Sequence, residues 1–408
     1  MSKNLHDRAL AYHKDGEPGK LDVTSHKKLD NDQDLSLAYS PGVAAPVREI
    51  AKDQSNVYQY TIKGNLVAVI TDGSAVLGLG NVGPLAAKPV MEGKAVLFKH
   101  FAGINVFNIE LDTQNVDEIV NTIKNIAPTF GGINLEDISA PRCFEIEERL
   151  IEELDIPVFH DDQHGTAIIV AAGLLNALEI QGKSITSAKI VVAGGGSAGI
   201  ATLDLLLNLG FNKENMILVD RRGVVSKEQI SIVNKYKAAF AVDTDKKTLE
   251  DALDGADVFI GVARGNLVTK KMVKSMARNP IIFALSNPDP EISVKDVFAC
   301  RDDALMATGR SDFPNQVNNV LGFPYIFRGA LDANSRIINT EMKIAAVHAI
   351  KNIAKLPVPK SLLDIYKVEE LSFGKDYFIP KPFDPRLIDL IPKAIFDAAV
   401  MSGVSRLK

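Results

Sequence analysis

Acidic side chains stand near the ends of two strand-like segments, and they are the first candidates for chemistry. Glu136 and Asp137 lie near the end of the segment 132–138, and Asp162 follows the segment 156–160. Mg²⁺ and Mn²⁺ prefer oxygen ligands, and two or three carboxylates with substrate oxygens would complete an octahedron around such an ion. Acids are also common in exposed loops and at helix starts. The spacing alone therefore leaves two interpretations open, a divalent-metal site and ordinary surface charge.

Two histidines beside the third acid raise the alternative of a zinc site. His160 and His164 are four residues apart, as in the H-E-x-x-H pattern of zinc enzymes, but position 161 is aspartate. The surrounding sequence predicts a strand-to-helix loop, whereas that pattern places both histidines on one face of a helix. We therefore predict that these histidines hold no zinc.

A glycine-rich loop in the middle of the chain points to a dinucleotide. It follows the strand-like segment 189–193, precedes the helical pattern 200–209 and fits G-x-G-x-x-G. Such glycines let the backbone approach a pyrophosphate, and the helix N-terminus offers it free N–H groups. An aspartate ends the next strand, 21 residues after the last glycine, where a carboxylate accepts hydrogen bonds from the adenosine ribose. The residues expected to bind the cofactor here are Gly194, Gly196, Ser197, Ala198, Gly199 and Asp220.

The choice of nicotinamide cofactor depends on the residues around Asp220. A carboxylate at this position favours NAD, because it repels the 2′-phosphate of NADP. Arg221 and Arg222 follow immediately, and they either neutralise that phosphate or remain solvated loop residues. The sequence favours NAD, with NADP as the alternative.

The elements that position these groups alternate between strands and helices. Short apolar segments predict strands over 66–71, 105–109, 132–138, 156–160, 189–193, 216–219, 258–262 and 281–285. Helical patterns lie between them, notably at 115–127 and at the largely apolar 166–181, which we expect to be buried between two domains. Strands separated by helices indicate parallel sheets. We predict an α/β protein: an N-terminal α/β substrate and metal domain over 1–161, then a doubly wound Rossmann-type domain over 162–408 with a C-terminal helical tail.

Composition and charge exclude several other classes. The chain has 408 residues and a formal net charge of −5, which argues against nucleic-acid or membrane-surface partners. Its longest uninterrupted apolar run, 167–175, is too short to span a bilayer, and the polar N-terminus lacks a signal-peptide core. Only Cys143 and Cys300 are present, so a disulfide framework is excluded. We expect a cytoplasmic protein.

A series of ordered motifs across nearly the whole chain resembles the short, bacterial-type malic enzymes. The motifs are Ala38–Ala44, Val69–Gly83, Val90–Lys94, Asn134–Ile138, Phe159–Ala167, Leu285–Pro288 and Asn318–Pro324. The resemblance implies oxidative decarboxylation of (S)-malate to pyruvate and CO₂, with reduction of NAD or NADP and a requirement for Mg²⁺ or Mn²⁺. The stretch Ala263–Asn266 departs from the family pattern, which has a Ser-x-Gly-like turn there, and this puts one cofactor contact in doubt.

The same resemblance assigns roles to individual residues. It implies that Lys94 is the general base for the malate hydroxyl, that Tyr39 is the acid that protonates the enol, and that Asp161 orients Lys94 or caps the following helix. A lysine acts as a base at pH 7 only if it is desolvated or near positive charge, and a bound metal ion would supply that charge. The implied metal ligands are Glu136, Asp137 and Asp162. The implied substrate and nicotinamide contacts are Lys94, Asn287, Asn318 and Asn319.

Two further implications concern assembly and rival functions. Tyr39 lies on a polar N-terminal arm with little apolar material to anchor it, and the resemblance implies a homodimer whose arm completes the partner's active site. A malolactic enzyme, which makes lactate without net cofactor reduction, is the nearest alternative function. A catalytically silent dinucleotide-binding sensor is a second, but a sensor needs neither Tyr39 nor Lys94 nor the acids.

Overall fold

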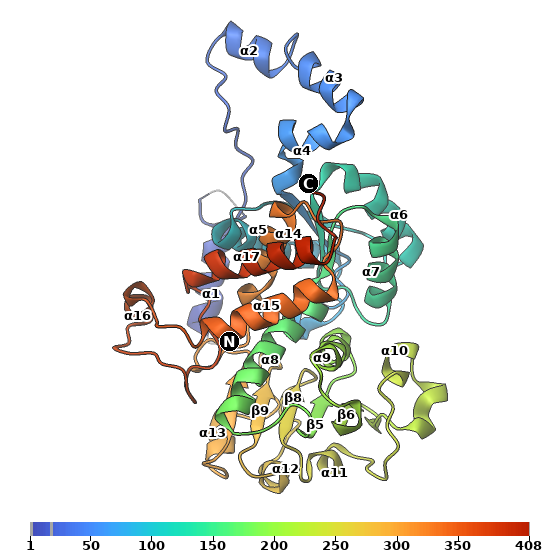
Figure 1. The fold of residues 1–408 in the computed structure, drawn as a ribbon, viewed down its shortest axis with the longest axis vertical. Coiled ribbons are helices and arrows are strands. Elements are labelled where there is room, and N and C mark those ends of the chain that lie inside the picture. Colours follow the sequence, from blue (N-terminus) through green and yellow to red (C-terminus); the bar gives the residue numbers. More distant parts are fainter. Residues whose placement is uncertain (1–2, 17–18, 408) are drawn as a thin grey trace.

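The computed structural model describes residues 3–16 and 19–407, in which helices surround two separate sheets (Figure 1). In this part of the chain the first sheet has four parallel strands in the order β2-β1-β3-β4. The strands are β1 (Leu66–Thr71), β2 (Asn105–Glu110), β3 (Gly132–Leu135) and β4 (Val158–His160). The predicted strands in this half of the chain are confirmed to within three residues.

Three helices connect these strands, and the longest of them carries the candidate lysine. They are α5 (Pro84–Ala102), α6 (Val116–Ile126) and α7 (Arg142–Glu153). Helix α5 begins at a proline and ends at Gly103, whose φ of +65° suits glycine. It packs on β1 and β2. Its buried positions recur every three or four residues, and Lys94 is one of them. A lysine on a core-facing helix position needs partners inside the protein.

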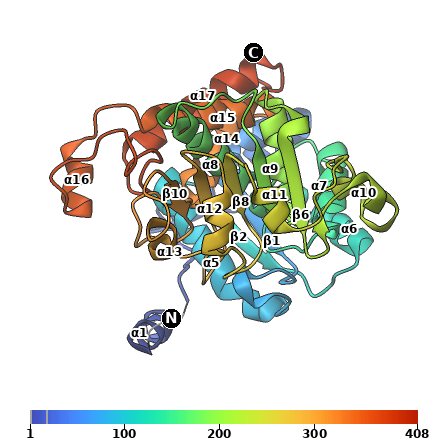
Figure 2. The ribbon, with the colours of Figure 1, turned by 90° about the horizontal axis from the view of Figure 1, so that it is seen from below.

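The second sheet has the Rossmann-type order expected from the sequence. Its six strands run β10-β9-β8-β5-β6-β7, all parallel except for the β6–β7 pair (Figure 2). The strands are β5 (Ile190–Ala193), β6 (Met216–Asp220), β7 (Gly223–Val224), β8 (Val258–Gly261), β9 (Ile281–Ala284) and β10 (Leu305–Thr308). The helices that accompany them are α9 (Ser197–Asn208), α10 (Lys235–Ala238), α11 (Leu249–Leu253), α12 (Lys270–Ser275) and α13 (Val294–Phe298). The predicted α/β fold class is confirmed, and β7 and β10 are additions to the prediction.

Helix α8 (Asp161–Ile180) runs between the two sheets and is buried along most of its length. The sequence predicted a loop up to residue 165, and this is wrong because the helix begins at Asp161. Aspartates in a first helical turn interact favourably with the helix dipole. In addition, the backbone N–H of His160, the residue before the helix, donates to the carboxylate of Glu147 at 2.9 Å. The burial predicted for this helix is confirmed.

The C-terminal helices close the molecule over α5 and α8. Helix α14 (Phe323–Asp332) packs on α5, and α15 (Thr340–Ile353) packs on α8. Helix α17 (Arg386–Met401) contacts both α14 and α15, whereas α16 (Lys360–Tyr366) stands on an outlying loop (Figure 1). The end of the chain thus packs against the α5 side of the first sheet as well as against α8.

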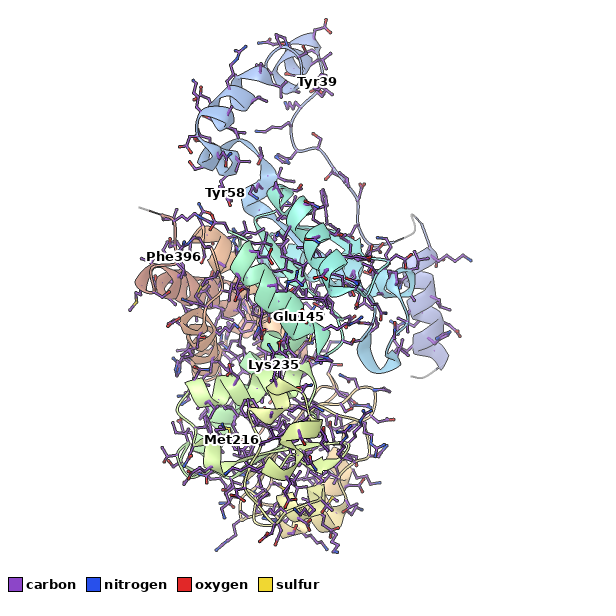
Figure 3. The ribbon with its side chains drawn as sticks, turned by 90° about the vertical axis from the view of Figure 1, so that its right-hand side faces the viewer. Tyr39, Tyr58, Glu145, Met216, Lys235 and Phe396 are labelled. Carbon is purple, nitrogen blue, oxygen red and sulfur yellow. The ribbon has the colours of Figure 1, made fainter. Side chains whose placement is uncertain are left out.

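The N-terminal arm projects away from this body (Figures 1 and 3). It carries α2 (Asp32–Ala38) and α3 (Ala44–Lys52) and returns to the body through α4 (Val57–Tyr60), whereas α1 (Lys3–Lys14) lies apart from it. Helices α2 and α3 have no buried residues. Among the described residues, no helix has the length and hydropathy needed to cross a bilayer.

Candidate active site

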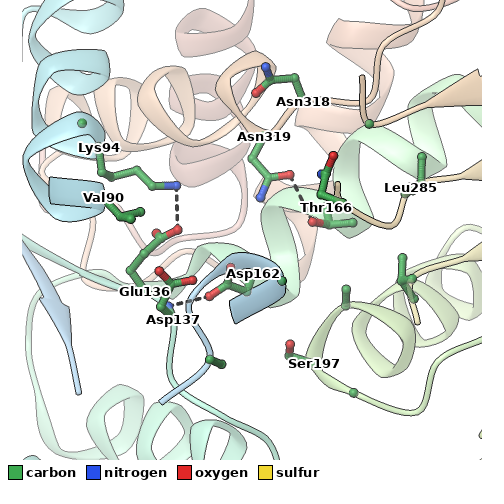
Figure 4. Close-up of a pocket in the computed structure, with 18 of the residues that line it drawn as sticks. Val90, Lys94, Glu136, Asp137, Asp162, Thr166, Ser197, Leu285, Asn318 and Asn319 are labelled. Atoms are coloured by element: carbon green, nitrogen blue, oxygen red, sulfur yellow. Dashed lines mark hydrogen bonds and ion pairs between the residues drawn. The ribbon is translucent and has the colours of Figure 1, made fainter. Parts of the chain in front are cut away.

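The site lies where the carboxyl ends of the two sheets face each other. In a parallel sheet, ligands bind beyond the carboxyl ends of the strands, where the strand order reverses. That point falls between β1 and β3 in the first sheet and between β5 and β8 in the second. A cavity of about 1040 Å³ lies there, lined by residues from both halves and from the loop that precedes α14 (Figure 4).

The three candidate metal ligands converge on one side of this cavity. One oxygen each of Glu136, Asp137 and Asp162 can be chosen so that all lie within 4.8 Å of one another. Strands β3 and β4 end in register, which brings the residues that follow them together. Asp137 has a φ of +54°, so the chain turns sharply after β3, and its backbone N–H donates to Asp162 Oδ2 at 2.7 Å. The structure therefore brings the three candidate ligands together.

Lys94 enters the cavity from α5 and points towards Glu136 (Figure 4). Asp161, which is outside the three-carboxylate cluster, is its second acidic partner. Its Nζ lies 2.8 Å from Glu136 Oε1 and 2.7 Å from Asp161 Oδ2. The ring of Phe323 lies beneath the ammonium, with its centroid 4.2 Å from Nζ. Asn134 Nδ2 donates to the other Glu136 oxygen at 2.8 Å. Glu136 therefore belongs both to the acidic cluster and to the immediate surroundings of the lysine.

Asp161 links Lys94 to Asn319, in the segment that precedes α14. The Asn319 amide donates from Nδ2 to Asp161 Oδ2 at 3.2 Å, and its oxygen accepts from Thr166 Oγ1 at 3.1 Å. Gly165 makes room for the aspartate, because a Cβ there would lie 2.0 Å from Asp161 Oδ1. The neighbouring Asn318 uses its side-chain oxygen to accept the N–H of residue 320, and it also lines the cavity.

The electrostatics of the group favour a cation. Burial raises the pKa of Glu136 well above its usual value; Lys94 opposes this shift, but the neighbouring carboxylates Asp162, Asp161 and Asp137 add to it. For Lys94, burial lowers the pKa, but Asp161 and Glu136 outweigh burial and leave the pKa above its ordinary value. Several buried acids thus share a single ammonium. A divalent ion at the cluster would relieve their mutual repulsion.

The glycine-rich loop forms the opposite wall. Gly194 has a φ of +127°, and a Cβ on it would lie 2.7 Å from the carbonyl oxygen of Val262. A Cβ on Gly199 would lie 1.8 Å from the Gly194 oxygen, whereas one on Gly196 would meet open space. These two close approaches require glycine, and the open space at the start of α9 fits a pyrophosphate. Three other predicted cofactor residues, Ser197, Ala198 and Asn287, line the main cavity as well.

A second cavity of about 750 Å³ adjoins the loop and contains Asp220. Lys237 Nζ lies 2.6 Å from Asp220 Oδ2, and a Cβ on Gly195 would lie 2.7 Å from Lys237 Cε. Burial raises the pKa of Asp220, but Lys237 and the backbone N–H of Arg222 outweigh it and lower the pKa below its usual value. Sequence reasoning missed Lys237, which is distant in the chain. The cations that line this cavity are Arg221, Arg222, Lys237, Lys247 and Arg264.

Tyr39 is the one predicted catalytic residue that the fold does not bring to the cavity of its own chain. It follows α2 on the projecting arm and is 71% exposed (Figure 3). The exposed apolar side chains of the same arm include Leu35, Leu37, Val43 and Val47.

A buried network behind the acids was also missed. The carboxylate of Glu147 on α7 accepts the His160 backbone N–H at 2.9 Å and the Gln163 amide at 3.0 Å, and lies 2.9 Å from His164 Nε2. Lys343 Nζ stands 3.2 Å from the His164 ring nitrogens. Burial raises the pKa of Glu147, but His164 and Lys343 lower it to about 2. Glu147 thus contacts the His164 ring and the His160 backbone, whereas the His160 ring has its Nδ1 3.7 Å from Asp162 Oδ2.

The signal that would have identified this acid is its helix position. On α7 the buried residues are Cys143, Phe144, Ile146, Glu147 and Leu150, so the acid occupies the apolar face.

We expect Glu147→Gln to destabilise the protein by about 3 kcal/mol in urea unfolding at pH 7, because it removes one partner of a buried charge network. Glu145→Gln, on the exposed face of the same helix (Figure 3), should change stability by less than about 0.5 kcal/mol.

The pH dependence gives this prediction a second check. The folded pKa of Glu147 is lowered, so its ionised carboxylate contributes stability above the ordinary carboxyl pKa of 4.5 and loses that contribution as the pH falls towards about 2. The difference between wild type and Glu147→Gln should be complete at pH 7 and shrink in acid. Equal stabilities of the two proteins at pH 7 would contradict the network.

The fold and this pocket define a class of protein. A Rossmann-type sheet presents its glycine loop to a cavity whose other wall carries a buried lysine and a carboxylate cluster. This is the arrangement of an oxidoreductase that binds a nicotinamide dinucleotide beside a small polar substrate.

Comparison with known proteins identifies the family. Residues 18–151 match the family model described as malic enzyme, N-terminal domain, and residues 163–374 match malic enzyme, NAD binding domain. The chain belongs to the malic enzyme family, as the motifs predicted.

Individual relatives cover the whole chain. The NADP-dependent malic enzyme of Halomonas elongata is 57% identical over 406 residues, covering 100% of this chain and 96% of that protein. The bifunctional malic/malolactic enzyme of Bacillus subtilis is 52% identical, covering 99% and 95%. A crystal structure of malic enzyme from Pyrococcus horikoshii matches with a TM-score of 0.90 and 43% identity, covering 99% and 92%. The chain spans about half the length of several other relatives, which are 53–57% identical to it.

Proposed function

We propose that the chain is a divalent-metal-dependent malic enzyme that oxidises and decarboxylates (S)-malate to pyruvate and CO₂ with reduction of a nicotinamide dinucleotide. The observation that carries the proposal is the position of Glu136, which contacts the Lys94 ammonium and belongs to the acidic cluster. A base and a metal site are thereby joined at one carboxylate, beside a dinucleotide loop. The Halomonas relative carries the name of the same activity.

Glu136, Asp137 and Asp162 would hold Mg²⁺ or Mn²⁺, since a set of carboxylate oxygens suits a hard cation. When bound, the ion would withdraw electron density from the C2 oxygen of malate, and the nicotinamide would accept the hydrogen and electron pair that leave C2. Engagement of Glu136 by the ion would remove one of the two anionic partners of Lys94. The pKa of the lysine would then fall towards the range that a base requires.

The chain's own residues perform the proton transfers and the positioning. Lys94 acts as the neutral amine and takes the proton of the C2 hydroxyl as the bond from C2 to hydrogen breaks, and Asp161 then pairs with the ammonium that forms. The C3–C4 bond then breaks, CO₂ leaves, and the electron pair of that bond forms the C2–C3 double bond of an enolate. The Lys94 ammonium returns its proton to the enolate oxygen, which gives the enol of pyruvate. Asn319 is fixed by Asp161 and Thr166 at the cavity wall, where Asn287 and Asn318 provide further amide contacts for substrate or nicotinamide.

We assign the protonation of the enol carbon to Tyr39 of the partner subunit in a homodimer. The exposed apolar side chains of the arm, among them Leu35, Leu37, Val43 and Val47, support this assignment, because such side chains are usually covered when an arm has a binding partner. A tyrosine hydroxyl is a weak acid suited to donating a proton to a carbon that carries developing negative charge. The same arm supports dimer formation and a shared active site.

For the cofactor, we propose NADP rather than the NAD that Asp220 alone suggests. The ion pair with Lys237 neutralises the carboxylate that would repel a 2′-phosphate, and four more cations line the same cavity.

Lys237→Ala should therefore lower kcat/KM for NADP at least tenfold, about 1.4 kcal/mol. The same change should leave kcat/KM for NAD nearly unaltered or raise it. A matched control is Lys235→Ala, whose exposed lysine pairs with Glu148 away from the cavity. A larger loss with NAD than with NADP would contradict the assignment.

The metal site has its own test. We expect Asp162→Asn to weaken Mn²⁺ activation at least tenfold, because it removes one anionic ligand, while NADP binding survives in the other half of the site. Mn²⁺ binding measured by electron paramagnetic resonance and NADPH binding measured by fluorescence separate the two. Unchanged Mn²⁺ affinity would remove Asp162 from the metal site.

Malolactic chemistry is the second candidate, and the name of the Bacillus subtilis relative supports it. That reaction would return the hydrogen and electron pair to pyruvate within the same site and release lactate. The ratio of lactate to pyruvate formed from malate distinguishes the two activities.

A further inference from the structure

Lys20 lies in the wall of the main cavity, beside the helix that carries Lys94. Its Nζ donates to the carbonyl oxygen of Pro89 at 2.7 Å, and its backbone N–H donates to Glu92 Oε2 at 3.1 Å. A Cβ built on Gly93 would lie 3.6 Å from Lys20 Nζ. Its ammonium is thus fixed over the residue that immediately precedes Lys94.

Lys20 differs from Lys94 in the partner of its ammonium, since Glu92 accepts from the backbone N–H of Lys20 and the ammonium itself donates to a carbonyl. Among the described residues that line this cavity, these two lysines are the cationic ones. Lys94 is held by Glu136 and Asp161, whereas Lys20 Nζ donates to a neutral carbonyl. An ammonium has three N–H donors, so two remain available to a ligand. Burial lowers the pKa of Lys20, and Glu92 opposes this only in part, so an added anion would stabilise the charged form.

The proposed substrate supplies such an anion. Malate carries two carboxylates, and chelation of the metal through the C2 hydroxyl and the adjacent C1 carboxylate leaves the C4 carboxylate without a partner. Three acids line the same cavity and repel it. We propose that Lys20 binds the C4 carboxylate of malate and so selects a four-carbon dicarboxylate over a monocarboxylate. This inference rests on the proposed function.

Steady-state kinetics of Lys20→Gln test the inference. The KM for malate should rise about 10- to 100-fold, because a charge-assisted hydrogen bond is lost, with kcat and the KM for NADP within about twofold of wild type. Lys20→Arg should recover most of the loss. Lys88→Gln is the matched control and should behave as wild type, because Lys88 lies on the exposed face of α5 and pairs with Glu110. Oxalate uses both its carboxylates to chelate the metal, so its inhibition constant should be unchanged in Lys20→Gln.

The outcomes separate this inference from the proposed function. If the wild type fails to turn over malate, the proposed function is overturned and the inference with it. If the wild type is active and Lys20→Gln keeps the malate KM of Lys88→Gln, the role of Lys20 alone is overturned. A fall in kcat without a rise in KM, or an equal weakening of oxalate, would also overturn it, because the lysine would then act on something other than the C4 carboxylate.

Discussion

Lys94→Ala should slow malate oxidation by about 10²–10⁴-fold, or roughly 3–5 kcal/mol, the typical cost of losing one general base. The structure gives the reason, since the ammonium sits between Glu136 and Asp161 at the edge of the acidic cluster. Among the described residues that line the cavity, Lys20 is the other lysine, and its Nζ is held by the Pro89 carbonyl. Single-turnover absorbance at the NADPH band measures the oxidation step directly.

Two controls accompany the lysine variant. Small exogenous amines should partly restore the rate of Lys94→Ala, because they can occupy the vacated space and accept the proton. Lys99→Ala, on the same helix and hydrogen-bonded to Asn105 at the exposed side, should retain wild-type oxidation. A first turnover of Lys94→Ala as fast as that of Lys99→Ala would show that the base lies elsewhere.

Tyr39→Phe should produce a comparable loss at a different step. The variant keeps the aromatic ring but has no proton to give, so protonation of the enol should slow by about 10²–10⁴-fold. Stopped-flow measurement should show NADP reduction in the first turnover, followed by slow release of pyruvate. If the first turnover were as slow as in Lys94→Ala, the two residues would act as one coupled unit.

Mixing the two inactive variants tests the position of Tyr39. In a dimer whose sites combine Lys94 of one chain with Tyr39 of the other, a hybrid has one intact site. An equal mixture should then recover about a quarter of wild-type activity, since half of the randomly formed dimers are hybrids with one working site of two. Absence of recovery, with subunit exchange confirmed by mass spectrometry, would place both residues in one chain's site.

Local sequence patterns were sufficient for eight of the strands, though not for β7 and β10, and for the acids that follow β3 and β4. Strand and turn chemistry is written in neighbouring residues, so the ends of β3 and β4 and the glycine loop before α9 could be located directly. The start of α8 could not, because the N–H of His160 is satisfied by Glu147, which comes from another helix. An element boundary set by a distant partner leaves no local signal.

Ion pairs and contacts between distant residues were the second feature that the sequence could not predict. Asp220 alone favoured NAD, and only the fold shows that Lys237 of α10 pairs with this carboxylate at the end of β6. The reverse problem applies to Tyr39, since its motif indicates catalysis while its position on the exposed arm gives it no role in its own chain's cavity. For Asp220 the missing information is a contact with a residue from another element, and for Tyr39 it is the proposed contact with a partner subunit.

The most direct test of the central claim is the stoichiometry of one reaction. The full chain is incubated with (S)-malate, NADP and Mn²⁺, and NADPH, pyruvate and lactate are measured together over the first minutes. The proposed function predicts equal amounts of NADPH and pyruvate, no lactate, and loss of both products with EDTA until Mn²⁺ is restored. Lactate without NADPH, or product formation that persists in EDTA, would contradict a metal-dependent oxidative decarboxylation of malate.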